Sequence, residues 1–194
     1  MHKKLLILPL LALMILLLAL PETGSRLWQS FAAGEGNDTT VIANIQGVDF
    51  TVPDLDKRLA VYAAQGRPQE EEALKRRLVA RELFYREACA AGCSVDEATV
   101  DAYLADLRQS LPTDAAAYSL FLEELEILGL TEDEYWQEYR QEYVEMMVTG
   151  QYYRELEADY WHGRLAPEAP LDFEGYYENT YLPGLFEKYQ VVMK

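Results

Sequence analysis

The hydrophobic positions between residues 41 and 59 predict a β-hairpin that leads into a helix. Gln46 and Gly47 supply a tight turn, and residues 48–50 return alongside the first strand. Alternate residues of a strand point to the same side, so one apolar face is expected. The side chains predicted on that face are Val41, Ala43 and Ile45.

A helix is predicted to begin directly after the hairpin, at Pro53. Thr51 is placed to cap it and forms a capping-box pattern with Asp54. Proline is tolerated in the first helical turn because the missing N–H would have no partner there. The helix is expected to run to Ala64 and to end at residues 65–68, QGRP.

A longer amphipathic helix is predicted over residues 69–91. Its apolar side chains recur at three- and four-residue intervals, with charged residues on the opposite face. The predicted buried positions are Leu74, Leu78, Val79, Leu83, Phe84 and Ala88.

Two shorter helices are predicted next. Ser94 and Glu97 form a capping box that starts the first, and Pro112 ends it. The second begins at Asp114 and is closed by Gly129. The predicted inward-facing side chains are Val100, Tyr103, Leu104 and Leu107 in the first helix and Tyr118, Phe121, Leu122 and Leu125 in the second.

The longest predicted helix runs from Glu132 to Tyr160, after a capping box formed by Thr131 and Glu134. Its large side chains alternate by three and four residues, which is the spacing of a continuous seam against neighbouring helices. The seam positions are Trp136, Tyr139, Tyr143, Met146, Gly150 and Tyr153.

The C-terminal part of the chain is predicted to form one more helix and a short strand. Residues 163–170 contain two prolines and interrupt the helical pattern. Helix resumes over residues 172–188 with a bend near Pro183 and Gly184, and residues 190–193 have the apolar character of a strand. The fold class predicted is therefore mainly α, with a small β-hairpin or sheet.

Four segments carry a resemblance to a known family: NIQGVDFTVPDL, LKRRLVARELFYREACAAG, SVDEATVDAYLADL and LGLTEDEYWQEYRQEY. Their order, over residues 41–145, resembles the N-terminal domain of SurA- and PrsA-type extracytoplasmic chaperones. The resemblance implies a helical chaperone domain whose small sheet is completed by a C-terminal segment. Family members commonly carry a parvulin prolyl isomerase domain, and this chain has no counterpart of it.

Composition argues against a nucleic-acid partner. The chain has 194 residues and a formal charge of -16, from 33 acidic and 17 basic residues, whereas binding a polyanion requires clustered Lys and Arg. Its length suits one globular domain, assigned here to residues 41–194. A solvated helical surface accounts for most of the acidic charge, although such a surface also attracts basic partners.

The N-terminus reads as an export segment. Basic residues precede an uncharged apolar run within residues 1–20, and residues 21–40 read as a polar, flexible linker. The apolar run is intermediate in length between a signal peptide and a membrane span, so cleavage and retention are both open. We favour an uncleaved anchor in the cell membrane, with the domain on the extracytoplasmic side; cleavage would make the protein secreted.

The sequence offers little for catalysis, and we expect no enzyme activity, catalytic residue, cofactor or metal. His162 is the only histidine outside the export segment, and no nucleophile, zinc-protease, P-loop or dinucleotide pattern is present. Cys89 and Cys93 lie four residues apart. Small buried thiols are the favoured reading of this pair, and a disulfide is the other.

The remaining function class is binding of polypeptide. Aromatic and methionine side chains offer large, adaptable contact area to unlike apolar segments. The candidate peptide-binding residues are Tyr135, Trp136, Tyr139, Tyr143, Met146, Met147 and Tyr153, and the alternative is that each of them fills the core. We expect an ATP-independent holdase for unfolded or partly folded exported proteins. A scaffold specific for one envelope protein is the alternative, and an enzyme ranks third.

Overall fold

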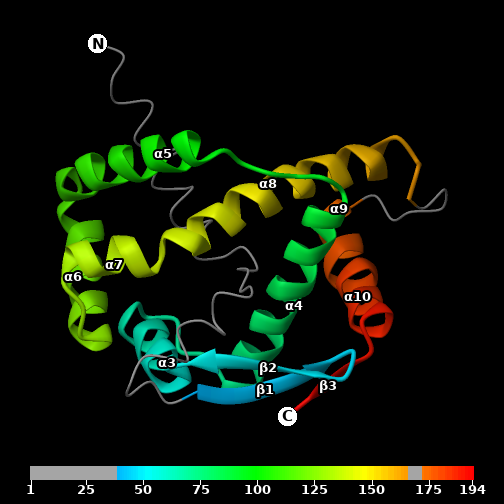
Figure 1. The fold of residues 1–194 in the computed structure, drawn as a ribbon, viewed down its shortest axis with the longest axis horizontal. Coiled ribbons are helices and arrows are strands. Elements are labelled where there is room, and N and C mark those ends of the chain that lie inside the picture. The colour runs from blue at the N-terminus through cyan, green and yellow to red at the C-terminus, as the bar shows by residue number, and fades with distance from the viewer. Residues whose placement is uncertain (1–38, 166–171) are drawn as a thin grey trace.

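The computed structural model describes residues 39–165 and 172–194 and shows a mainly helical protein with one small antiparallel sheet (Figure 1). The predicted export segment and nearly all of the predicted linker lie outside the described residues. The strands are β1 (Thr39–Ile45), β2 (Val48–Pro53) and β3 (Val191–Met193). The helices are α3 (Leu55–Ala64), α4 (Glu71–Ala90), α5 (Glu97–Ser110), α6 (Ala115–Leu128), α7 (Glu132–Glu138), α8 (Arg140–Trp161), α9 (Phe173–Tyr176) and α10 (Leu182–Lys188), with a 3-10 turn at Leu111–Thr113 and a π-helical turn at Tyr177–Tyr181.

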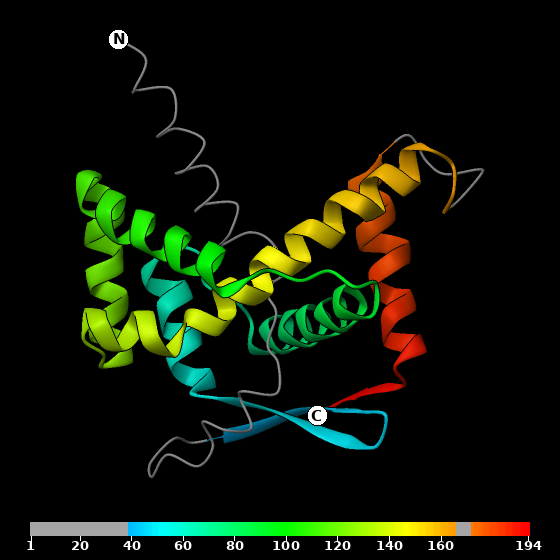
Figure 2. The ribbon, with the colours of Figure 1, turned by 45° about the horizontal axis from the view of Figure 1, so that its top comes forward.

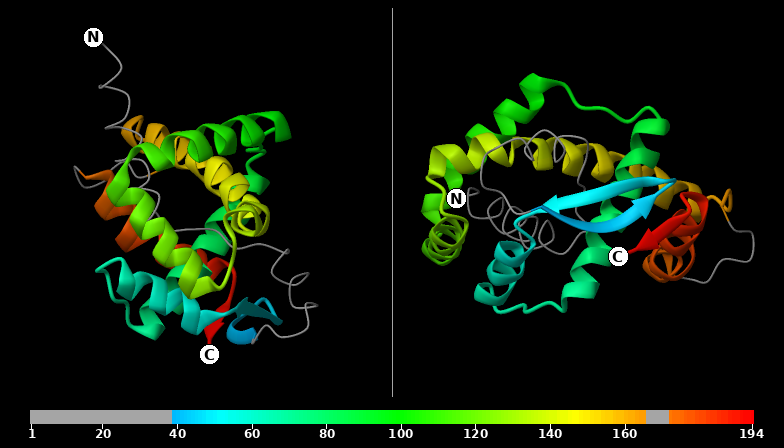
Figure 3. Two further views of the ribbon diagram at one scale, coloured as in Figure 1. Left: turned by 90° about the vertical axis from the view of Figure 1, so that its left-hand side faces the viewer. Right: turned by 60° about the horizontal axis from the view of Figure 1, so that its bottom comes forward.

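The sheet has the order β2-β1-β3, with β3 beside the hairpin (Figure 3, right). Gln46 and Gly47 both have positive φ, 53° and 85°, as the predicted two-residue hairpin turn requires. Ala43 pairs with Met193 in the antiparallel β1-β3 ladder. The expectation that a C-terminal segment completes the sheet is thereby confirmed.

The first strand departs from simple alternation. The register of β1 against β2 shifts between Val41 and Ala43, so Ile42 and Ala43 both oppose one position of β2. A bulge of this kind turns the side chains beyond it to the other face. Ile42 is fully buried while Val41 is 39% exposed, and the predicted shared face of Val41, Ala43 and Ile45 is wrong at Val41.

The predicted capping box at Thr51 is also wrong. Thr51 belongs to β2, which continues to Pro53, and the residue before α3 is Asp54. Asp54 turns the chain through a left-handed conformation with φ 49° and makes no side-chain capping bond. Proline fits the last position of a strand at the sheet edge because it lacks the N–H that a neighbouring strand would need.

Helix α4 lies at the centre of the molecule (Figures 1 and 2). All six of its predicted apolar positions are buried, but Lys75, Arg81 and Glu82 are buried as well. The predicted charged, solvent-facing side is therefore wrong in the middle of the helix. The cause is that α4 contacts α8, α10 and β1, so neighbours cover more than one face.

Helices α5 and α6 form the predicted helical hairpin, with one cap misassigned. Asp96, rather than Ser94, caps α5 by accepting the Thr99 N–H at 2.8 Å. Gly129 ends α6 as predicted, with φ 74°. Leu122, predicted to face inward, is 46% exposed, and this position on α6 is wrong.

The longest predicted helix is two helices. The capping box of Thr131 and Glu134 starts α7 as predicted, but α7 ends at Glu138 and Tyr139 interrupts it with φ -88° and ψ 0°. These angles lie in the bridge region between helix and strand. The chain changes direction there, and α8 runs away from α7 toward the opposite end of the molecule (Figure 2).

The described residues form two large hydrophobic cores and a small third cluster of Ala88, Cys93 and Val148, and α8 contributes side chains to all three. Figure 2 shows how α8 extends from the α5–α7 region to the α9–α10 region. The larger core joins the sheet, α3, α4, the end of α8 and the α9–α10 region. The smaller core joins α5, α6 and α7, with Val61 of α3. The predicted helix over residues 172–188 is present, although its irregular turn, Tyr177–Tyr181, lies before Pro183 instead of at it.

Within the described ranges, no helix combines the length and the apolar character needed to cross a membrane.

Candidate functional site

The seven predicted peptide-binding residues lie along α7 and α8, and the structure divides them. Tyr135 and Trp136 are buried, with 9% and 5% of their surface exposed. The other five are half-buried: Tyr139, Tyr143, Met146, Met147 and Tyr153.

The two buried residues belong to an aromatic cluster in the smaller core. Phe121 lies edge-on to Tyr135 with ring centroids 5.0 Å apart, and it packs against Trp136 at 5.5 Å. Tyr135 also stacks on Tyr139 at 4.5 Å. Tyr135 and Trp136 therefore fill the smaller core, as the alternative to peptide binding predicts.

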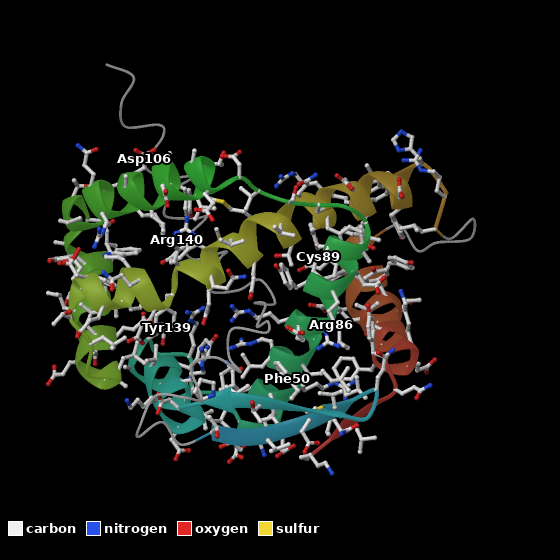
Figure 4. All side chains as sticks on the ribbon, viewed as in Figure 1. Phe50, Arg86, Cys89, Asp106, Tyr139 and Arg140 are labelled. Atoms are coloured by element: carbon white, nitrogen blue, oxygen red, sulfur yellow. The ribbon has the colours of Figure 1, made fainter. Side chains whose placement is uncertain are left out.

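Tyr139 and Tyr143 continue this cluster toward solvent. Tyr139 occupies the junction of α7 and α8, with Arg140 next to it at the start of α8 (Figure 4). Tyr143 lies 5.9 Å from Trp136 and 6.1 Å from Tyr103, measured between ring centroids. Burial is the largest cause of the raised pKa of both Tyr139 and Tyr143, so their hydroxyls stay neutral at physiological pH.

Tyr153 sits at the other end of α8 and packs against the larger core. Its ring lies edge-on to Phe173 at 5.1 Å and to Tyr177 at 5.2 Å, measured between centroids. The predicted seam thus runs along two helices, α7 and α8, and contacts both large cores.

A buried ionic network occupies the stretch of α8 where it crosses α3 and α4. Glu142 accepts a hydrogen bond from Arg58 of α3 at 2.9 Å and from Arg81 of α4 at 2.8 Å. The Arg81 side chain is 2% exposed and that of Glu142 is 19% exposed. One carboxylate therefore ties three helices together.

The charge state of Glu142 follows from its two partners. Burial favours the neutral carboxyl group, but attraction to Arg81 and Arg58 and their hydrogen bonds outweigh it, and the pKa of Glu142 is lowered. Glu142 is consequently ionised at neutral pH.

Two further carboxylates are buried close to this network. Glu145 is fully buried and accepts a hydrogen bond from Gln141 at 3.0 Å. Glu82 is 3% exposed and pairs with Arg86 at 2.7 Å. The Thr149 hydroxyl donates to the backbone carbonyl of Glu145 at 2.8 Å.

The sequence contains a signal for this network that was not among the predictions above. Glu142, Glu145 and Thr149 recur at three- and four-residue intervals, which places them on one face of α8. A polar row with this spacing beside an aromatic seam indicates a helix with neighbours on two sides. The partners Arg58 and Arg81 are separated from it by long stretches of chain and gave no such signal.

Gly150 has room for a methyl group on the half-buried face of α8. A Cβ atom added at Gly150 would meet only the end of the flexible Arg154 side chain, 3.7 Å from its Nη1. Met146, Met147 and Tyr153 lie three or four residues to either side of it on the helix. The position is a suitable place for a substitution that covers this face without disturbing the backbone.

The metal-ligating side chains and the two cysteines of the described residues are placed as follows. Among them, no group of three or more His, Cys, Asp or Glu side chains could hold a metal ion. Cys89 is exposed and Cys93 is buried, and both are free thiols, so the reading of two buried thiols is wrong for Cys89. Burial and the nearby Glu155 carboxylate raise the pKa of Cys93, which makes it a poor nucleophile.

Comparison with known proteins finds no matching family model, no matching curated protein and no matching solved structure.

Proposed function

We propose that the chain is an ATP-independent, chaperone-like holdase that binds apolar segments of unfolded exported polypeptides along α8. The observation that carries the proposal is the half-buried face of this helix and its junction with α7. That face consists of Tyr139, Tyr143, Met146, Met147 and Tyr153, with Gly150 among them.

The chemistry of this face suits varied apolar clients. Methionine adapts its shape to different partners because it is unbranched and has three rotatable bonds. Tyrosine contributes a large apolar ring, and its hydroxyl tolerates contact with water at the edge of a site. Promiscuous binding surfaces use such adaptable side chains.

The order of elements and the C-terminal completion of the sheet support the proposed kinship with SurA- and PrsA-type chaperone domains. The export segment at residues 1–20 places the domain, in this proposal, on the extracytoplasmic side of the cell membrane, anchored or secreted. Newly exported, incompletely folded proteins are then the clients that the domain would meet.

The test compares Gly150→Trp with Gly150→Ala in the full chain. Both changes place a side chain where only Arg154 is close, and alanine favours helix over glycine by about 1 kcal/mol. The assay is suppression of aggregation of a reduced, unfolded client at stoichiometric protein. We expect G150A to match the unmodified chain and G150W to lose most of the suppression.

Two results would count against the proposal. Lack of suppression by the unmodified chain refutes holdase activity outright. Equal suppression by G150W and G150A removes α8 as the binding face. A pull-down that returns a single stoichiometric partner would instead favour the scaffold alternative.

A further inference from the structure

The two large cores divide the described residues into two lobes. The smaller core takes nearly all of its side chains from residues 97–147, which comprise α5, α6, α7 and the first part of α8. We call this segment the helical lobe. The larger core takes its side chains from the sheet, α3, α4, the last part of α8 and the α9–α10 region, and we call these elements the sheet lobe. Each lobe therefore has a core of its own.

Two stretches of chain connect the lobes, and they lie close together. The first is residues 91–96, between α4 and α5, and the second is Thr149 with Gly150, in the middle of α8. The small third cluster contains Cys93, from the first stretch, and Val148, directly before the second. The chain therefore passes from one lobe to the other at one place.

The connection within α8 has two features that favour bending of a helix. The hydroxyl of Thr149 donates to the backbone carbonyls of Glu145 at 2.8 Å and Met146 at 3.1 Å, and threonine bonds of this kind often bend helices. Gly150 comes next, and glycine makes a helix easier to deform. Both residues lie between the half of α8 that packs on the smaller core and the half that packs on the larger one.

Away from the connections, polar groups hold the lobes together. On the side where α3 meets α6 (Figure 1), Lys57 donates to the backbone carbonyl of Leu128 at 3.1 Å, and the Gln65 amide donates to Glu124 at 3.3 Å. The ionic network centred on Glu142 also joins the helical lobe to α3 and α4. Water can replace such bonds, so each contributes only modestly to the interface.

Apolar contact between the lobes is limited. Among the described residues, Val61 is the only side chain of the sheet lobe that belongs to the smaller core. Units within one chain move relative to each other unless their interface is large and hydrophobic. The interface between these lobes lacks that apolar character.

We propose that the two lobes open and close about a hinge formed by residues 91–96 and Thr149–Gly150. The structure shows the closed form. On opening, the helical lobe rotates away from α3 while both large cores stay packed. Opening uncovers Val61 and the apolar side chains that face it, which gives the chain a second apolar surface that is hidden in the closed form. This inference does not depend on the proposed function.

The test measures how fast a single thiol between the lobes reacts with Ellman's reagent in the full chain. The background is C89A/C93A, and V61C or V100C supplies the thiol. Both positions are buried valines of the smaller core, 9% and 1% exposed, but Val61 lies between the lobes and Val100 lies inside the helical lobe. V79C, fully buried in the larger core, is a second control. Each rate is divided by that of the same thiol in the urea-unfolded chain, and circular dichroism verifies that each variant is folded.

We expect V61C to be exposed about 10-fold or more often than V100C and V79C, with a weaker dependence on urea, because rotation of a lobe exposes less surface than unfolding does. K57A/Q65A removes two contacts between the lobes and should raise V61C labelling about 3-fold or more. Labelling of V100C should not change. The control D106A/Q109A, at exposed positions of α5, should change neither rate.

Two kinds of result would overturn the hinge. Equal protection of V61C and V100C, with the same urea dependence, would mean that both thiols react only after unfolding. A V61C rate equal to that of the unfolded chain, or one that K57A/Q65A leaves unchanged, would mean that the reagent reaches this position without any opening.

Discussion

Replacement of Glu142 by Gln tests whether the ionic network holds α3, α4 and α8 together. Glutamine keeps the shape of the side chain but removes its charge, which leaves Arg58 and Arg81 without their shared counterion. Arg81 cannot turn to water, since its side chain is 2% exposed. E142Q therefore removes one partner of a buried ion pair and leaves the other partners in place, which is the kind of change known to be strongly destabilising.

The expected loss of unfolding free energy is about 3–5 kcal/mol, the range for breaking a buried pair on one side. A second route gives a similar size. Glu142 accepts two hydrogen bonds, at 2.9 and 2.8 Å, and hydrogen bonds to charged groups contribute about 1.5–3 kcal/mol each. The Arg58 side chain is 11% exposed, so solvent recovers only a small part of the loss.

The assay is urea unfolding of the full chain at neutral pH, followed by far-UV circular dichroism. The control is Glu126→Gln on α6, an exposed position, where the change should stay within about 0.5 kcal/mol. A loss below about 1 kcal/mol in E142Q, with the control unchanged, would refute the view that this network holds the three helices together.

The same variant carries a pH prediction. The pKa of Glu142 is lowered from 4.5 in the folded chain, so its stabilising effect is complete above pH 4.5 and is lost as the pH falls through the folded value. E142Q has no such step. The stability difference between the two chains should therefore shrink below pH 4.5, and a difference that stays constant down to pH 3 would contradict the assignment.

Three smaller predictions test the caps and thiols. D96A should lower the unfolding free energy by about 1 kcal/mol while S94A leaves it unchanged; equal effects would contradict the observed cap. G129A should cost about 1 kcal/mol or more, because φ at this position is 74° and disfavours a side chain; thermal unfolding measures it. Iodoacetamide should label the exposed Cys89 before the buried Cys93, and equal labelling rates on mass spectrometry would contradict that order.

Much of the fold followed from local sequence patterns. Gln46 and Gly47 identified the hairpin, Gly129 identified the end of α6, and Thr131 with Glu134 identified the start of α7. Each of these signals acts through neighbouring residues only. The pairing of Ala43 with Met193 spans almost the whole domain, and its expectation came from the resemblance to a family.

The errors in the fold share a physical cause, which is tertiary context. Thr51 matched a capping pattern, but strand pairing kept it in β2. Ser94 was predicted to cap the next helix, but the chain enters α5 two residues later and Asp96 is the cap. No proline or glycine marks the break at Tyr139 in the sequence. The ring of Tyr139 stacks on that of Tyr135 there, a contact that the sequence pattern did not reveal.

The site was harder to predict than the fold. Periodicity placed Trp136 and Tyr153 on one seam, yet Trp136 is buried in the smaller core and Tyr153 is half-buried against the larger one. The ionic network joins Glu142 to Arg58 and Arg81 over long sequence separations. With 33 acidic residues in the chain, nothing in the composition distinguished this carboxylate from the others.

The central claim, that α8 binds apolar polypeptide, is tested most directly by NMR of methionine methyl groups. The chain has five methionines; Met146 and Met147 lie on the proposed face, and Met193 lies on β3 beside Ala43. Titration of the full chain with an apolar peptide should shift the Met146 and Met147 signals saturably and leave Met193 in place. A saturating peptide that leaves both of these signals unmoved would contradict the account.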